Sequence, residues 1–532
     1  MQKFFMLFAL IFSVSFGASA QVFKNLSTHQ KSLGFQNYYD TKSLRPVKIA
    51  IFDKGFAGFE AEIGRSLPEN TYYMPGPVLS PDDLKTEHGL RMAQIVTALV
   101  TNELQNPSVI KEFYLYNVFG YSNFKAAIDD AIARKMDVIS YSEVWEYGGN
   151  NDGEGFINEQ VSRATRAGIT WVNAAGNFAL TTYNSKVKTV SDDWLQLPDQ
   201  NNALAIRCNE NPTGKCNMKV VLSWNDFNND VEVGTKKDLD LALTDDLLNI
   251  VQNSSLQQSN DPKEGRPGFS KYPREILVAE VNVGTFYLRV KNRSKNFSTQ
   301  DSFRITVDGE SVTMPSRSKT ESLLNPADNA SVITVGASDS NRSSVSVSLN
   351  KPDILAPSSM VLQDGSEFRG SSNATAIVAA GIALLKSTSG KALTRSQIIS
   401  RTTKELDWSR GGRSLQGFGF SPTQVNCFVP RVWKDAPMHI EMALAAGAVL
   451  VDTSLRVRLM TPFDPIELAP DLRRRNQTDM IVITPEGQYK LYGRFDQIPQ
   501  NAVEVFQRPV EAGLCTLPAT AGAKKFFLNP RI

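Results

Sequence analysis

Apolar residues between positions 47 and 180 form short continuous runs that alternate with longer segments of helical spacing. The first run, 47–52, is apolar on both faces, which is typical of a strand in a parallel sheet covered by helices. Helical spacing follows at 92–100 and again at 124–134. Further strand-like runs lie at 113–118, 136–141 and 169–177. This alternation predicts an α/β fold built on a parallel sheet.

The pattern changes near residue 200. Short β-type segments separated by polar turns fill residues 200–315, which predicts an inserted antiparallel β-sandwich, and α/β runs return at 331–337 and 351–357. A length of 532 residues favours two to four domains. We infer a polar lead at 21–46, a first α/β part at 47–195, the insert at 196–316, a second α/β part at 317–428 and a small α+β extension at 429–532.

Small polar residues precede a strongly apolar helix in the second α/β part. Residues 374–385 place apolar side chains at i, i+3 and i+4 without a charge among them, so the helix is expected to be buried on most sides. Gly370, Ser371 and Ser372 lie at its start, where backbone N–H groups lack partners within the helix. A serine there gains from the positive end of the helix dipole, although an ordinary helix cap has the same composition.

The amino terminus has the pattern of a secretory signal peptide. Lys3 precedes a short apolar core, and residues 18–20 form an Ala-x-Ala cleavage site, so residues 1–20 are expected to be removed. The sequence therefore predicts a secreted or periplasmic protein, without a later membrane span. The formal net charge of +2 gives no reason to expect a nucleic-acid partner.

Four cysteines form an even set in this exported chain, which favours disulfides. The simplest of the three possible connectivities joins Cys208 to Cys216 and Cys427 to Cys515. No Cys-x-x-Cys or His-x-x-His spacing accompanies them, so we expect no metal at these cysteines.

An acidic loop in the insert offers a second place to look for a metal. Asp226, Asn228, Asp230 and Glu232 alternate there, as in some calcium loops. No glycine follows at the sixth position, and Lys237 stands where an EF-type loop has its glutamate. Solvated turn residues are the favoured interpretation, with a structural calcium ion left as the alternative.

Three residues suited to nucleophilic catalysis lie at the edges of predicted α/β elements: Asp53 after the first strand, His88 near the start of a helix, and Ser372. A serine hydroxyl needs a base to take its proton, and a histidine needs a carboxylate to orient it. The chain order Asp, His, Ser is one of three known for this triad, the order found in subtilisin.

Six blocks of sequence, in the correct order, resemble the subtilisin-like serine proteases, the subtilase family. Residues 51–55 resemble the family's Asp-Thr-Gly block, and 88–94 resemble His-Gly-Thr-His-Val-Ala-Gly. Residues 173–179 are similar to the Ala-Ala-Gly-Asn block, and 370–381 to Gly-Thr-Ser-Met-Ala-Thr-Pro-His-Val-Ala-Gly. Two structural blocks at 331–337 and 351–357 complete the series.

The resemblance implies a catalytic triad of Asp53, His88 and Ser372, with Asn177 as an oxyanion donor. It also implies two walls of the pocket for the side chain that precedes the cut bond. One wall is Ala174, Ala175 and Gly176; the other is Ser142, Glu143 and Val144, where the family has Ser-Leu-Gly. Val144 is expected to narrow this pocket. Glu143 either adds a negative charge near its mouth or points to solvent.

These observations together indicate a secreted serine endopeptidase that hydrolyses polypeptides through an acyl-enzyme and needs no cofactor for its chemistry. The alternative is a catalytically silent protein that uses the β-sandwich as a binding surface. The resemblance supplies a complete triad and an oxyanion asparagine, which packing alone does not require, and this argues against the alternative. The oligomeric state does not follow from the sequence.

Overall fold

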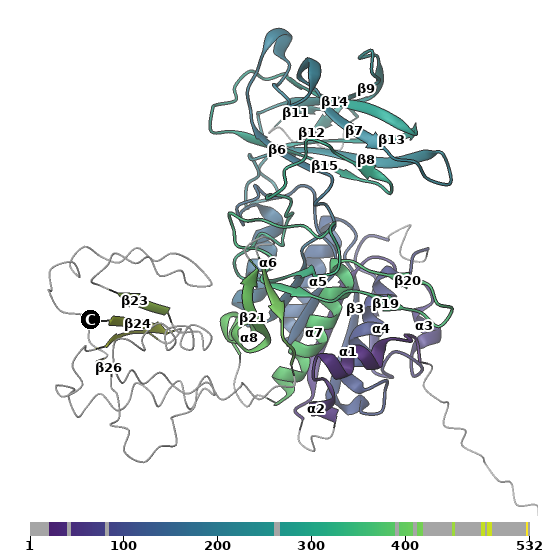
Figure 1. Cartoon of the computed structure of the whole chain (residues 1–532), viewed down its shortest axis with the longest axis vertical. Helices are drawn as coiled ribbons and strands as arrows, with labels where there is room; N and C mark the ends of the chain where they lie inside the picture. Colours follow the sequence, from purple (N-terminus) through teal and green to yellow (C-terminus); the bar gives the residue numbers. More distant parts are fainter. Residues whose placement is uncertain are drawn as a thin grey trace, which may run out of the picture.

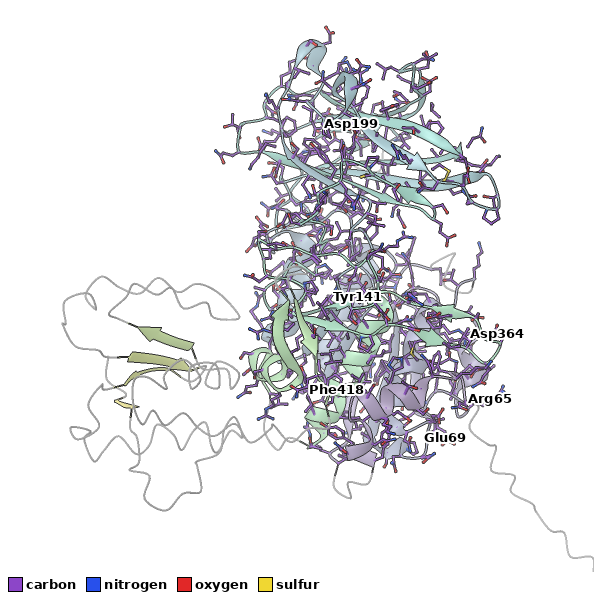
Figure 2. All side chains as sticks on the ribbon, in the orientation of Figure 1. Arg65, Glu69, Tyr141, Asp199, Asp364 and Phe418 are labelled. Carbon is purple, nitrogen blue, oxygen red and sulfur yellow. A yellow bond between two sulfur atoms is a disulfide. The ribbon has the colours of Figure 1, made fainter. Side chains whose placement is uncertain are left out.

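The computed structural model describes residues 21–39, 44–79, 85–259, 267–388, 393–407 and 412–418, and four strands beyond them. Figure 1 shows a lower body of helices around a central sheet, and a β-rich part above it. Side chains fill both parts, and Tyr141 lies in the interior of the lower body (Figure 2). The expected signal peptide at 1–20 falls outside the described residues.

The lower body is built on a nine-stranded sheet, which confirms a large parallel sheet. Every neighbouring pair runs parallel except the last, because β21 is antiparallel to β22. In spatial order the strands are β2 (Thr71–Met74), β3 (Ile110–Asn117), β1 (Val47–Asp53), β4 (Val138–Tyr141), β5 (Thr170–Ala174), β17 (Ile333–Ala337), β18 (Ile354–Ala356), β22 (Gly412–Leu415) and β21 (Thr403–Asp407).

Helices cover both faces of this sheet, as the doubly apolar strands require. Successive side chains of a strand point to opposite faces, and β1 divides accordingly. Ile49 and Ile51 join the core that contains α4 (His88–Thr101) and α7 (Ser371–Thr388). Ala50 and Phe52 join the opposite core, with α5 (Gly120–Arg134) and α6 (Phe156–Arg166). Because β1, β4 and β5 run parallel, their carboxyl ends meet at one edge of the sheet.

The polar lead does not stand apart from the sheet. It forms α1 (Leu26–Ser32) and α2 (Gln36–Tyr39), and Phe23 and Phe35 are fully buried in the same core as α4 and α7. Phe35 packs on Phe418 with ring centroids 5.4 Å apart. Residues 21–39 are too few to fold by themselves, so their structure depends on packing into this core.

The upper part consists of two antiparallel sheets that share one buried core. One contains, in order, β10 (Ile250–Ser254), β9 (Leu239–Thr244), β14 (Gly284–Asn292), β7 (Leu204–Cys208) and β16 (Val312–Thr313). The other contains β13 (Arg274–Asn282), β8 (Lys215–Trp224), β15 (Ser302–Asp308) and β6 (Thr182–Lys186). Because β6 pairs with β15, this part includes residues that precede the start expected at 196.

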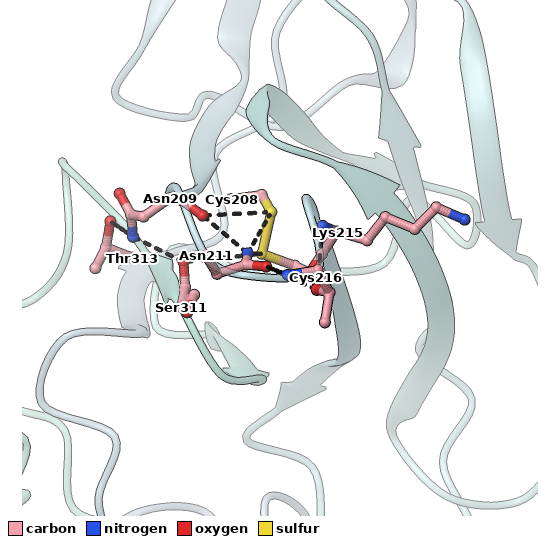
Figure 3. The surroundings of a disulfide bond; sticks show 8 residues. Cys208, Asn209, Asn211, Lys215, Cys216, Ser311 and Thr313 are labelled. Carbon is pink, nitrogen blue, oxygen red and sulfur yellow. Dashed lines mark hydrogen bonds between the residues drawn. A yellow bond between two sulfur atoms is a disulfide. The ribbon is translucent and has the colours of Figure 1, made fainter.

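A disulfide joins Cys208 of β7 to Cys216 of β8, and so links the two upper sheets (Figure 3). The Asn211 amide lies beside both sulfur atoms, with Nδ2 3.7 Å from Cys216 Sγ and 3.9 Å from Cys208 Sγ. Asn209 donates to the Ser311 carbonyl across the same corner at 2.7 Å. The disulfide therefore joins two residues that are eight positions apart in sequence and lie in different sheets.

The remaining described elements are short or lie toward the carboxyl terminus. The expected second disulfide, Cys427–Cys515, and most of the expected extension at 429–532 fall outside the described residues. No helix in the described part of the chain is long and apolar enough to cross a membrane. These further elements are α3 (Phe59–Glu62), α8 (Arg395–Thr402), β11 (Gln257–Gln258), β12 (Phe269–Ser270), β19 (Met360–Val361), β20 (Glu367–Phe368), and an antiparallel sheet of β23 (Val449–Asp452), β24 (Met480–Thr484), β25 (Gly487–Leu491) and β26 (Leu528–Asn529).

Candidate active site

Asp53 and His88 form a direct hydrogen-bonded pair at the carboxyl edge of the sheet. Asp53 ends β1 and is fully buried, whereas His88 begins α4 with its side chain 42% exposed. His88 Nδ1 lies 2.8 Å from Asp53 Oδ1 and 3.0 Å from Oδ2. The backbone N–H of Lys54 donates to the same Oδ1 at 2.8 Å. A carboxylate fixed in this way orients the imidazole and leaves its Nε2 free to accept a proton.

Gly89 makes the approach of α4 to Asp53 possible. A Cβ at position 89 would lie 2.8 Å from the Asp53 Cβ and 2.7 Å from the Phe56 ring, closer than side-chain atoms pack. Any larger residue would push the first turn of α4, and with it His88, away from β1.

The surroundings of His88 favour its protonated form. Removal of the ring from water opposes protonation, but the charge of Asp53 and its hydrogen bond, together with the charge of Glu143, outweigh that effect. They raise the pKa of His88 to about 9, against an opposing contribution from Lys54.

Ser372 lies in the first turn of α7, the helix that packs against α4. Its side chain is partly exposed, whereas that of Ser371 is fully buried. Ser372 Oγ donates to the Ser142 carbonyl at 3.0 Å. Within the described residues, no hydrogen bond joins Ser372 to His88. In proteins without a bound substrate, such bonds are often long or misaligned.

Ser371 fixes the orientation of Asn177. Asn177 Oδ1 accepts from the Ser371 backbone N–H at 3.1 Å and from its hydroxyl at 3.3 Å, so the Nδ2 donor faces away from Ser371. The Ser371 hydroxyl in turn accepts from the Gly176 N–H at 3.1 Å. Gly370 leaves room for this amide, because a Cβ there would lie 3.1 Å from Asn177 Nδ2. The side chain of Asn177 is partly exposed and so can reach a ligand beside Ser372.

The two expected pocket walls lie close to each other. Val144 Cγ2 is 3.2 Å from the position a Cβ on Gly176 would occupy. Val144 also packs against a small apolar cluster made of Ala175, Leu323 and Ala327. The neighbouring wall residues Ser142 and Ala174 are buried. The Val144 side chain therefore lies beside Gly176.

Glu143 points toward Asp53 and His88 and not into solvent. Its side chain is only 19% exposed, and Oε2 lies 3.3 Å from Lys54 Nζ. One carboxylate oxygen of Glu143 lies within 4.8 Å of both a ring nitrogen of His88 and a carboxylate oxygen of Asp53. Burial, reinforced by the charge of Asp53, raises the pKa of Glu143 to about 7, although Lys54 and His88 oppose the shift.

The residues of the acidic loop have partners within the protein. Asp226 accepts from Thr235 and pairs with Lys237, while Glu232 pairs with Lys271 at 3.0 Å. Asn228 and Asp230 each accept from a backbone N–H two residues later. Such contacts are those of turn residues. In the part of the chain that the structure describes, the only group of side chains close enough together to hold a metal is Asp53, His88 and Glu143.

Comparison with protein families matches the subtilase family over residues 45–420, more than half of the chain. The chain belongs to the subtilase family. Among solved structures, the Clostridium perfringens CspB protease matches with 13% identity and a TM-score of 0.40, over 67% of this chain and 87% of that chain. A comparison with curated proteins finds no match.

The residues quoted from this subtilase's sequence blocks thus converge in space. Asp53 contacts His88, Asn177 contacts Ser371, and Val144 faces Gly176. The functions assigned to them remain predictions at this point. No role for Lys54 or Ser371 follows from the sequence alone. The signal for Lys54 was a charge where the family block has threonine, and Ser371 gave no signal beyond its place beside the nucleophile position.

Proposed function

We propose that this subtilase is a secreted serine endopeptidase with the triad Asp53, His88 and Ser372. Its substrates are then polypeptides, and its chemistry uses the side chains described above. The observation that carries the proposal is the direct Asp53–His88 hydrogen bond at the carboxyl edge of the sheet, beside the helix that starts at Ser371. Nothing in the packing of the core requires a buried aspartate to meet a half-exposed histidine there.

In the proposed reaction, Ser372 Oγ attacks the carbonyl carbon of the scissile bond while His88 Nε2 takes the hydroxyl proton. Asn177 Nδ2 and the Ser372 backbone N–H donate to the oxyanion. The carbon–nitrogen bond then breaks, and His88 returns the proton to the leaving amine. Water hydrolyses the acyl-enzyme by the same route and restores Ser372.

The Ser372 side chain must first leave the Ser142 carbonyl. That bond, at 3.0 Å, is a single neutral hydrogen bond, and rotation about χ1 moves Oγ between staggered positions. A bound substrate competes for the backbone around Ser142 and so favours the rotated state. The antiparallel part at 182–318 serves as an accessory β-sandwich on the catalytic body.

A fluorophosphonate probe, which phosphonylates activated serines, tests this proposal. We expect the label on Ser372, its loss in Ser372→Ala, and its retention at Ser372 in Ser371→Ala. Peptide mapping by mass spectrometry identifies the labelled serine. A wild-type protein that folds but takes no label, and cleaves no peptide library, would support a silent binding protein instead.

A further inference from the structure

A second carboxylate lies beside the catalytic pair. Glu143 follows β4 by two residues and reaches to within 4.8 Å of His88 and Asp53, with its side chain mostly buried. The family blocks that this sequence resembles have leucine where this chain has Glu143, and threonine where it has Lys54. The site therefore holds one negative and one positive charge where uncharged residues are usual.

The other charged groups around His88 have their own partners. Glu87, just before α4, pairs with Arg91 at 2.5 Å. After β4, Glu146 pairs with Lys219 at 2.5 Å, and its charge acts on Lys54. After β1, Lys54 lies beside Glu143 with its side chain 48% exposed. Glu143 is thus the carboxylate, besides Asp53, whose charge favours the protonated His88.

We propose that Glu143, held in place by Lys54, is a second carboxylate that stabilises the protonated imidazole of His88. This inference rests on the proposed function and adds a positioning residue to it. Glu143 does not touch the reacting atoms. It acts through His88, as a charge fixed where the imidazolium forms.

The charge of Glu143 has two opposing effects on the rate of the proposed reaction. Since the imidazolium forms during attack by Ser372, a nearby carboxylate stabilises that step. The same carboxylate favours a proton on His88 in the free protein, so the neutral base is abundant only at alkaline pH. An enzyme of this design works fast above the pKa of His88 and weakly at neutral pH.

The chain contains only three histidines, His29, His88 and His439, which makes the pKa of His88 directly measurable. Histidine labelled with carbon-13 at Cε1 gives three ring signals, and the spectrum of His88→Ala assigns the one from His88. The titration of this signal does not require that the protein cleave peptides. It is followed for wild type, Glu143→Gln, Glu143→Asp and Glu146→Gln.

We expect the His88 signal of wild type to titrate near 9. Glu143→Gln should lower that midpoint by about one pH unit, the scale of one charge at this separation in a half-exposed site. Glu143→Asp, which keeps the charge, should stay closer to wild type than Glu143→Gln does. Glu146→Gln removes the same charge three residues away and should leave the midpoint unchanged.

The rate of peptide cleavage gives the second measurement. In Glu143→Gln the pH at which kcat/KM rises on the acid side should fall together with the His88 midpoint. On the alkaline plateau, kcat should fall by about tenfold. An unmoved His88 midpoint in Glu143→Gln would overturn the inference. If that variant does not fold, Glu143→Leu, which also removes the charge, replaces it, and an unmoved His88 midpoint in Glu143→Leu overturns the inference equally. Absence of cleavage with a shifted midpoint would instead contradict the proposed function and leave the electrostatic role standing.

Discussion

The Asn177 amide shows how one residue fixes another at the proposed oxyanion site. Ser371 occupies the oxygen of this amide with two hydrogen bonds, and no hydrogen bond from Nδ2 is found among the described residues. A preorganised donor costs no rearrangement when negative charge develops on the substrate oxygen.

Asn177→Ala should therefore lower kcat by about 10²–10³ with little change in KM, the scale known for the corresponding donor of subtilisin. Steady-state kinetics on a fluorogenic peptide measures both constants. Asn177→Asp is the matched variant, since it keeps the shape and replaces the donor with an acceptor, and it should be as slow. A near-normal kcat for Asn177→Ala would show that another group holds the oxyanion.

Val144 is expected to act on substrate choice at the same scale. Its Cγ2 approaches Gly176 across the proposed pocket, so large aromatic side chains before the cut bond should be disfavoured relative to small ones. One methylene of misfit is worth about 1–3 kcal/mol, which corresponds to roughly 10–200-fold in kcat/KM.

A peptide library varied at the residue before the scissile bond measures this preference for wild type and Val144→Gly. Wild type should favour small residues, and Val144→Gly should gain cleavage after Phe and Tyr. If wild type already cuts best after Phe and Val144→Gly changes nothing, Val144 does not shape the pocket.

Among the elements, strand β13 contains a glutamate whose charge affects the stability of the upper sheets. Glu275 is fully buried and accepts from Leu256 N–H at 3.0 Å and from Gln258 Nε2 at 2.7 Å. Burial raises the pKa of Glu275 to about 7 despite these hydrogen bonds. The folded state therefore binds a proton at pH values where the unfolded chain has released it.

Stability contributed by this group is present below the pKa of the unfolded chain and falls as pH rises toward about 7. The loss amounts to about 3 kcal/mol for a shift of this size. Glu275→Gln should remove that part of the slope, whereas Glu280→Gln, an exposed substitution on the same strand, should keep it. Thermal unfolding between pH 4 and 8 compares the variants, and equal slopes in wild type and Glu275→Gln would contradict the argument.

Elements with a strong apolar pattern were predictable from the sequence, and their contacts across the fold were not. The spacing in 47–52 and 374–385 requires a strand and a helix buried on most sides, and β1 and α7 are such elements. Strand β6 escaped prediction because Thr182–Lys186 is polar and only half-buried, so its pairing with β15 decides its state. Lys54 and Glu143 are far apart in sequence, and only the adjacency of β1 and β4 brings them together.

At the scale of the whole molecule, the amino-terminal segment supports the approach to Ser372. The Asn25 side chain donates to the Ser359 carbonyl at 2.8 Å and accepts from the Val361 N–H at 3.0 Å. Phe23 forms a backbone bridge with Leu362 in the same place. The hairpin of β19 and β20, which this segment holds, leads directly to Gly370 and α7.

The last prediction concerns this support. Phe23→Ala removes a fully buried ring and should lower the free energy of unfolding of the α/β part by about 3–5 kcal/mol. Asn25→Ala leaves the Val361 N–H without its partner and should cost about 1–3 kcal/mol, while the Ser359 carbonyl keeps its contact with His29 Nε2 at 2.9 Å. Lys31→Ala, on the exposed face of α1, is the control and should stay within about 0.5 kcal/mol of wild type. Because Ser372 lies in this part of the molecule, the loss of fluorophosphonate labelling with increasing urea reports its unfolding separately from that of the upper sheets. If Phe23→Ala and Lys31→Ala lose labelling at the same urea concentration, residues 21–39 rest on the core without stabilising it, and the hairpin before Ser372 keeps its position by its own contacts.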